Sequence, residues 1–250
     1  MQSHSMLSRP RVMRARGKAL SGRSPPTTPG PRALPVRVAQ RCSAADKTLV
    51  FDFAGVLFHW QPLDLLRREL PQRAHDAASA QWLFDVIFEA YGGDWSEFDR
   101  GRVEVPELVR RIAARTGLPP RDVQTVVDAV PAELQPLPAT VALLRRLRDD
   151  GRRLFFLSNM PQPYAEHLER EHAFVGWFAD GVFSARVHLN KPEPAIFELA
   201  AARFGSAPGE LVLLDDHGPN VQAARALDWN ALQFSDAAQA EAEMAERGWW

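Results

Sequence analysis

Two segments of the chain end in carboxylate side chains that follow an apolar run. Asp52 comes directly after Leu49-Val50-Phe51, and Asp215-Asp216 follow Leu211-Val212-Leu213-Leu214. A short apolar run bounded by turn residues is typical of a buried parallel strand. Two adjacent acids at the end of such a strand repel each other unless a cation joins them. The pattern predicts a cation site. The alternative interpretations are a turn at Asp52 and a helix N-cap at the acid pair.

Hydrogen-bond donors stand at comparable positions elsewhere in the chain. Ser158-Asn159 follow the apolar run Leu154-Phe155-Phe156-Leu157, and Lys191 precedes a proline-containing turn into a helix. Hydroxyl, backbone N–H and ammonium groups all donate to anionic oxygens. Asn220, an amide, lies shortly after the acid pair. These residue types favour a site for an anionic group, while a buried turn is the structural alternative for Ser158.

Such residues come together only if the strands that carry them end at one edge of a sheet. Apolar runs predict strands near residues 49–51, 153–157, 181–184, 211–214 and 231–234. Helical patterns alternate with them at residues 138–147, 163–172, 193–204 and 219–227. This alternation predicts an α/β fold with a parallel sheet and right-handed crossovers. In such folds ligands bind beyond the carboxyl ends of the strands, which is where the polar residues are expected.

The segment 62–136 interrupts this alternation with helical patterns alone. Four such patterns begin near Leu63, Trp82, Val105 and Pro119, with no strand between them. We therefore expect a core formed by residues 46–61 and 137–250, with a small helical bundle inserted at residues 62–136. The tryptophans, among them Trp60, Trp82, Trp95, Trp177 and Trp229, are expected to pack in the core or in the helical bundle and not to bind ligand.

Asp52, Ser158, Lys191 and Asp215-Asp216, in this order, resemble the four signature motifs of the haloacid dehalogenase-like hydrolase superfamily. The resemblance covers roughly Thr48 to Phe234. It implies a Rossmann-like three-layer α/β/α core with an inserted helical cap. It also implies a phosphatase that depends on Mg²⁺ and acts on a small phosphorylated metabolite.

Phe98-Asp99-Arg100-Gly101 adds a likeness to the sugar-phosphate phosphatases of the superfamily and to the N-terminal domains of soluble epoxide hydrolases. The resemblance makes Asp52 the nucleophile that forms an aspartyl-phosphate. It places Mg²⁺ between Asp52 and Asp216, with the carbonyl of Ala54 as a third oxygen and Asp215 acting through water. Oxygen ligands and retained waters suit Mg²⁺.

By the same resemblance, the phosphoryl group is bound by Ser158, the N–H of Asn159 and Lys191. Lys191 also balances the negative charge and is therefore counted with Asp52 and Ser158 as catalytic. Asn220 supports the site by orienting Lys191 or Asp215.

One position departs from the phosphatase pattern. The family's usual acid–base aspartate lies two residues after the nucleophile, and Ala54 occupies that position here. General acid–base help is typically worth about 10² to 10⁴ in rate. Side chains that would replace it are His59, Asp64, Glu97 and Asp99.

Ala54 keeps other functions open. A non-catalytic protein that binds a phosphorylated ligand is one alternative, and a 2-haloacid dehalogenase, which needs no metal, is another. Phosphonoacetaldehyde hydrolases also have alanine there, but they require a cap lysine. No lysine lies between Lys47 and Lys191, which argues against that activity.

Composition separates the N-terminal segment from the rest. Residues 1–45 carry Lys18 and eight arginines without an acid, a charge of +9, so the net charge of −1 leaves −1 − 9 = −10 for the remainder. The segment is rich in proline and is expected to be disordered and dispensable. A transit peptide or a leader upstream of Met6 or Met13 is the alternative.

The rest of the composition is ordinary for a globular protein. A single cysteine, Cys42, excludes an intrachain disulfide framework, and no apolar run is long enough to span a membrane. We expect a cytoplasmic protein, or an organellar one if residues 1–45 are a transit peptide. No specific nucleic-acid or membrane partner is expected, and the oligomeric state stays open.

Overall fold

The computed structural model describes residues 47–249. The expectation that residues 1–45 are disordered and dispensable concerns a segment outside this range. Within the described range, no helix has the length and apolar character that crossing a membrane requires.

Five parallel strands form the single sheet of the described chain, in the order β3-β2-β1-β4-β5. Phe51 lies opposite Phe156 on one side and Leu214 on the other, so β1 is central. The five strands are β1 Thr48–Phe51, β2 Leu154–Ser158, β3 Asp180–Phe183, β4 Leu211–Asp215 and β5 Asn230–Gln233. The sequence-based strands agree to about one residue, and the predicted α/β fold with a parallel sheet is confirmed.

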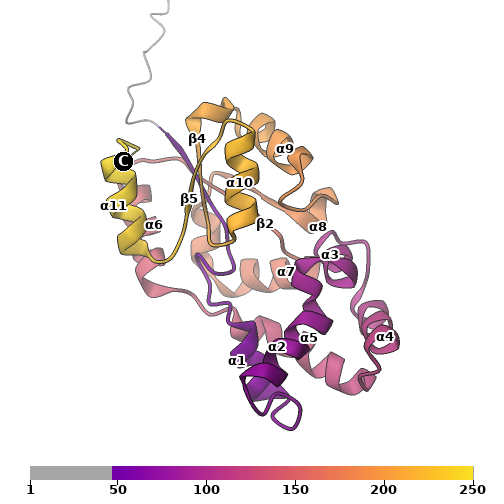
Figure 1. Ribbon diagram of the computed structural model, residues 1–250. Helices are drawn as coiled ribbons and strands as arrows, with labels where there is room; N and C mark the ends of the chain where they lie inside the picture. Colours follow the sequence, from indigo (N-terminus) through magenta and orange to yellow (C-terminus); the bar gives the residue numbers. More distant parts are fainter. Residues whose placement is uncertain (1–46, 250) are drawn as a thin grey trace, which may run out of the picture. The chain divides into compact units, whose positions relative to one another are not determined.

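Helices cover both faces of this sheet and make three layers (Figure 1). Alternate residues of β1 face opposite sides: Leu49 and Phe51 pack in one apolar cluster, and Val50 packs in the other. The first cluster includes side chains of α6 Pro138–Asp149, α7 Gln162–Glu171 and α11 Ala237–Glu246. The second includes those of α9 Pro194–Phe204 and α10 Gly218–Ala226. Burial on both faces explains why the strands are continuous apolar runs.

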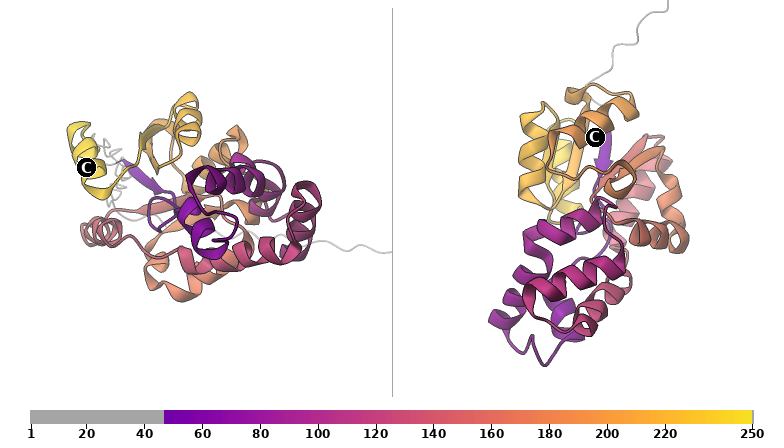
Figure 2. Two further views of the ribbon diagram at one scale, coloured as in Figure 1. Left: turned by 60° about the horizontal axis from the view of Figure 1, so that its bottom comes forward. Right: turned by 90° about the vertical axis from the view of Figure 1, so that its right-hand side faces the viewer.

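Between β1 and β2 the chain forms only helices, which we call the insertion. Its helices are α1 Pro62–Glu69, α2 Ala77–Phe88, α3 Gly93–Asp99, α4 Val105–Thr116 and α5 Pro120–Glu133. Proline occupies the first turn of α1, α4 and α5. Backbone N–H groups in a first turn have no partner within the helix, so proline loses no hydrogen bond there. In Figures 1 and 2 these indigo-to-magenta helices gather at one end of the sheet.

The insertion begins and ends at one place. The N–H of His59 donates to the carbonyl of Gln135 at 2.8 Å, and Phe58 forms an antiparallel bridge with Pro136. Four helices were predicted here and five are present; α3 was missed because its seven residues are too few to establish a helical repeat. Short turns complete the described chain: η1 Glu89–Tyr91, η2 Ala173–Trp177, α8 Ser184–Val187 and η3 Pro208–Glu210.

Candidate active site

Strands β1 and β4 end side by side, at the point where the strand order reverses. The N–H of Asp52 donates to the carbonyl of Leu214 at 2.9 Å, which joins the two strand ends. The carboxylates of Asp52, Asp215 and Asp216 offer oxygens within 4.8 Å of one another. This reversal is where open α/β sheets bind ligands, and the three predicted acids meet there.

Lys191 connects two of these acids. Its Nζ lies 2.9 Å from Asp52 Oδ2 and 2.6 Å from Asp215 Oδ2. Burial by itself lowers the pKa of Lys191, but the two carboxylates outweigh that effect and raise it, so the side chain keeps its charge. Three carboxylates and one ammonium leave a formal charge of −2 (−3 + 1) at the cluster.

Asp215 is held from several sides. Asn220 Nδ2 lies 3.1 Å from both of its carboxylate oxygens, and the N–H of His217 donates to Oδ1 at 2.9 Å. With the Lys191 ion pair, every oxygen of this fully buried carboxylate has a partner. Of the two partners that the sequence allowed for Asn220, the structure selects Asp215.

The carboxylate of Asp216, by contrast, is exposed, and its hydrogen bond is to its own backbone, with no ion pair to another residue in the range 47–249. It lies against Gly55, where an added Cβ would stand 2.3 Å from Asp216 Oδ2. Gly55 also has a φ of +80°, a conformation that favours glycine. Asp216 thus faces the other acids with its oxygens available.

The electrostatics of the cluster fit a divalent cation. Burial raises the pKa of Asp52 to about 7. Lys191 acts to lower this pKa, while the charges of Asp215 and Asp216 raise it further. Burial and the neighbouring Asp215 also raise the pKa of Asp216. A bound cation favours the ionised forms again, and a set of donors made of oxygen suits Mg²⁺.

Ser158 and Asn159 end β2 beside this cluster. The Ser158 hydroxyl is fully buried and has no hydrogen-bond partner in the described chain. Such an unpartnered group costs about 1–3 kcal/mol, and a ligand or water would satisfy it. The Asn159 side chain bonds the backbone of Lys191 twice, at 2.9 and 2.8 Å, and so connects the end of β2 to the lysine's loop.

A cavity of about 210 Å³ lies beside the cluster, and the fully buried Ser158 and Asp215 are not part of its lining. Asp52, Ala54, Asn159, Lys191 and Asp216 line it from the sheet edge. Most of the opposite wall is apolar or aromatic and comes largely from the insertion: Trp60, Tyr91, Trp95, Val130, Leu134, Met160 and Tyr164.

A family model for haloacid dehalogenase-like hydrolases matches residues 47–228 of this chain. The chain belongs to the haloacid dehalogenase-like hydrolases. A sesquiterpene phosphatase of Aspergillus oryzae is 26% identical over 191 residues, which cover 76% of this chain and 90% of that protein.

Solved structures agree with the fold. A predicted hydrolase of this family from Porphyromonas gingivalis is 25% identical, with a TM-score of 0.62 over 80% of this chain and 98% of that one. A family enzyme from Bacteroides thetaiotaomicron, solved with magnesium and inorganic phosphate, is 21% identical, with a TM-score of 0.58 over 74% of this chain and 92% of that one.

Of the four candidate acids in this hydrolase, the structure places one in the cavity. His59 is exposed and lies outside the lining. Asp64 is exposed and pairs with Arg67 at 3.0 Å. Glu97 pairs with Arg100 at 3.3 Å. Asp99, at the end of α3, lines the cavity and is only 6% exposed.

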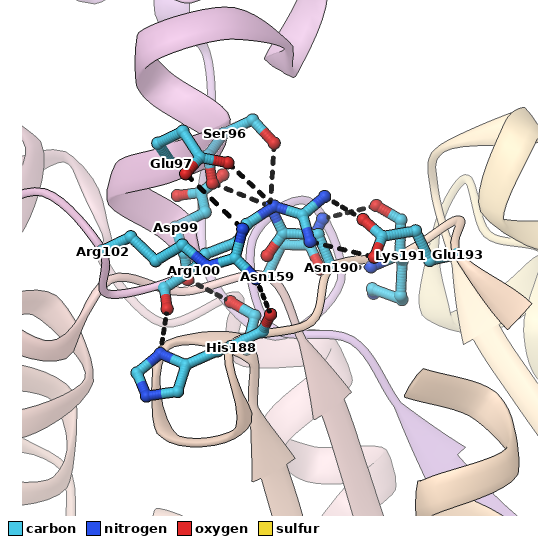
Figure 3. Close-up of polar contacts among 11 residues, drawn as sticks. Ser96, Glu97, Asp99, Arg100, Arg102, Asn159, His188, Asn190, Lys191 and Glu193 are labelled. Atoms are coloured by element: carbon cyan, nitrogen blue, oxygen red, sulfur yellow. Dashed lines mark hydrogen bonds and ion pairs between the residues drawn. The ribbon is translucent and has the colours of Figure 1, made fainter. Parts of the chain in front are cut away.

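The end of α3 bonds directly to the core of the hydrolase (Figure 3). Arg100 pairs with Glu193 through two nitrogens, and its carbonyl lies 2.8 Å from His188 Nδ1. Asn190, the residue before Lys191, donates to the carbonyl of Ser96 at 2.9 Å. The insertion and the loop that carries Lys191 are therefore joined by polar contacts at this end of the cavity.

Sequence reasoning missed part of the cavity wall. Trp60 and Trp95 were expected only to pack, yet both line the cavity. Tyr91 was not singled out. It follows two residues with left-handed backbone, Glu89 and Ala90, and itself has a φ of +65°. Its hydroxyl accepts a hydrogen bond from Trp60 Nε1 at 3.0 Å. No local pattern announces this turn, because none of the three is glycine.

Proposed function

We propose that this hydrolase is a Mg²⁺-dependent phosphatase whose substrate is the monophosphate ester of a small, largely apolar alcohol. The observation that carries the proposal is the Lys191 ammonium between Asp52 and Asp215, in a cluster with a formal charge of −2. A carboxylate beside a cation site is a suitable nucleophile toward phosphorus, because the cation and the ammonium offset the charge of the phosphoryl group.

In this proposal Asp52 and Asp216 hold Mg²⁺ with the carbonyl of Ala54, and Asp215 contributes through water. When bound, the metal supplies charge neutralisation and Lewis acidity at the phosphoryl oxygens. The free carboxylate of Asp216 and the raised pKa values of Asp52 and Asp216 support this assignment. The magnesium and phosphate in the Bacteroides thetaiotaomicron enzyme are in line with it.

The phosphoryl group is bound by donors at the strand ends. The Ser158 hydroxyl, which has no partner in residues 47–249, donates to a phosphoryl oxygen together with the N–H of Asn159. Lys191 neutralises charge on the same group while it holds Asp52. A carboxylate oxygen of Asp52 then attacks phosphorus, and an aspartyl-phosphate forms as the alcohol leaves. Water hydrolyses this acyl phosphate, which releases inorganic phosphate and regenerates the carboxylate of Asp52.

In this proposal the insertion, residues 62–136, acts as a cap over the site. Side chains from the insertion and its N-terminal linker form much of the cavity wall, and their aromatic rings favour an apolar alcohol over a sugar. The 26% identity with a sesquiterpene phosphatase supports the same substrate class. The sequence led us to expect a small phosphorylated metabolite as substrate. The apolar cavity lining favours metabolites whose alcohol part is apolar.

The alternatives fit less well. A dehalogenase needs no metal, so three clustered acids with one lysine would leave an uncompensated charge in its site. A non-catalytic protein that binds phosphorylated ligands does not require Asp52 to face the cavity beside Lys191. Turnover of a phosphate ester distinguishes a phosphatase from a non-catalytic binding protein directly.

The test is hydrolysis of p-nitrophenyl phosphate with Mg²⁺ and with a chelator. We expect turnover that requires the metal, that Asp52→Asn abolishes, and that the matched surface variant Asp64→Asn retains. Absence of turnover, or full activity in the chelator, would refute the phosphatase assignment. Decyl phosphate should have a higher kcat/KM than a hexose phosphate, and the reverse order would refute the apolar substrate class alone.

A further inference from the structure

Hydrolysis of an alkyl phosphate needs a proton for the departing oxygen. The alcohol leaves as a strongly basic alkoxide unless an acid protonates it during bond cleavage. Ala54 stands where the family's usual donor would be, and it lines the cavity with a methyl group. A donor, if the site has one, must come from another part of the cavity.

Besides the cation cluster, four titratable side chains line the cavity in the described chain: Tyr91, Asp99, Tyr164 and His217. The Tyr164 hydroxyl donates to the carbonyl of Val127 at 2.8 Å. Burial raises the pKa of both tyrosines above their usual value, so they are weak acids. His217 directly follows Asp216, a member of the cation cluster, and the centroid of its ring lies 5.7 Å from that of the Tyr91 ring.

Asp99 has the surroundings of a proton donor. It is 6% exposed, and its carboxylate has no hydrogen bond within residues 47–249. The neighbouring Arg100 directs its guanidinium to Glu193 and Glu97 instead (Figure 3). An acid that is buried without a counterion keeps its proton.

The titration of Asp99 agrees with this geometry. Burial raises the pKa of Asp99 to about 8, against the effect of Arg100 and with reinforcement from Asp52. Asp99, Tyr91 and Tyr164 all line the cavity, so the carboxyl faces the same space as the two rings. At neutral pH the carboxyl carries the proton that the leaving oxygen requires.

The position of Asp99 is set by the core. Its backbone carbonyl accepts a hydrogen bond of 2.5 Å from the Ser184 hydroxyl. At Gly101 (φ +65°), an added Cβ would stand 2.7 Å from the carbonyl of Ala185, so α3 and α8 approach closely. Asn190 joins Ser96 to the loop of Lys191. Asp99 is thus held at a fixed place relative to Lys191, which in turn holds Asp52.

We propose that Asp99 is the catalytic acid and base of this hydrolase, in place of the residue two positions after the nucleophile. The proposal rests on the phosphatase function above. An oxygen of Asp52 forms a bond to phosphorus, and the electron pair of the breaking P–O bond goes to the alcohol oxygen, which takes the Asp99 proton. In the second step Asp99 accepts a proton from the water that attacks the aspartyl-phosphate, and Asp52 and Asp99 regain their starting forms.

The test is Asp99→Asn, which preserves shape and removes the proton. For decyl phosphate we expect kcat to fall by about 10² to 10⁴, the range that acid–base catalysis supplies. p-Nitrophenyl phosphate has a good leaving group, so Asp99→Asn should still release a rapid burst of one nitrophenol per site before slow turnover. Asp94→Asn is the matched control, because Asp94 lies on the same helix and pairs with Arg115.

The outcomes separate the two proposals. If wild-type protein hydrolyses neither ester, the phosphatase function is wrong. If it hydrolyses both, and Asp99→Asn leaves decyl phosphate turnover unchanged or abolishes the nitrophenol burst, Asp99 is not the acid. The assignment is also refuted if His217→Gln lowers kcat for decyl phosphate by the factor that is expected of Asp99→Asn.

A second variant keeps the proposal testable if Asp99→Asn fails to fold. Because Asp99 already supplies the proton, Ala54→Asp should lower decyl phosphate turnover, since its carboxylate would repel Asp52. A clear increase would mean that the site lacks an acid, and would overturn the assignment of Asp99.

Discussion

Lys191 Nζ lies 2.6 Å from Asp215 Oδ2, and both side chains are fully buried. The same ammonium holds Asp52 at 2.9 Å. Removing one member of a buried charge group is far more damaging than removing an exposed pair, because the remaining charges lose their compensation. This contact therefore ties the stability of the core to the site at its edge.

Lys191→Met should lower the free energy of unfolding by about 3–5 kcal/mol, since it leaves two buried carboxylates without a cation. Urea unfolding at pH 8 in a chelator measures this. Lys47→Met is the control, because Lys47 is only half-buried and its ammonium donates to the backbone carbonyl of Gly209, and a change within about 0.5 kcal/mol is expected. Equal losses in the two variants would show that Lys191 carries no special part of the stability.

Gly55→Ala should weaken Mg²⁺ binding by about 10- to 100-fold, the range for residues that support a metal ligand. Its Cβ would stand 2.3 Å from Asp216 Oδ2 and displace that carboxylate. Gly151→Ala is matched in backbone, with φ +79° against +80°, but its Cβ would meet nothing within 4 Å. Calorimetric titration with Mg²⁺ compares them, and weakened binding in both would contradict the steric explanation.

Mg²⁺ should raise the Tm of the wild-type protein, because a ligand that binds only the folded state stabilises it. At a hundred times its Kd, such a ligand adds about 2.7 kcal/mol to the free energy of unfolding. Asp216→Asn removes a free carboxylate from the cluster and should abolish most of this rise. Asp149→Asn, an exposed acid that pairs with Arg148, should retain it. Thermal unfolding with and without Mg²⁺ decides, and an undiminished rise in Asp216→Asn would place the metal elsewhere.

Asp99→Asn should make the protein more stable above about pH 5, although it impairs the proposed reaction. The pKa of Asp99 is about 8 in the folded state against a usual value of 3.8. Folding therefore takes up a proton, and the free energy of unfolding falls as pH rises between these values. The Tm advantage of Asp99→Asn should grow from pH 5 to about pH 8 and then level off. A constant difference across this range would mean that Asp99 titrates normally.

Much of the core followed from the sequence. The strand runs before Asp52, Ser158 and Asp215 were found to about one residue, because a strand buried on both faces is a short apolar block with a polar end. Parallel strands share one edge, so the meeting of these residues also followed. Helix α3 was missed, since seven residues carry too little periodicity to distinguish a helix from a loop.

The sequence alone determined which residue types stand at the strand ends, and hence the family and the class of chemistry. Only the tertiary structure decided which groups meet. It selected Asp215 as the partner of Asn220, aimed Arg100 at Glu193, and left Asp99 buried in the cavity while Asp64 and His59 stayed at the surface. The physical reason is that burial and charge pairing depend on contacts between segments far apart in the chain. Arg100 and Glu193, for example, pair across 93 positions of the sequence. No local pattern encodes such contacts.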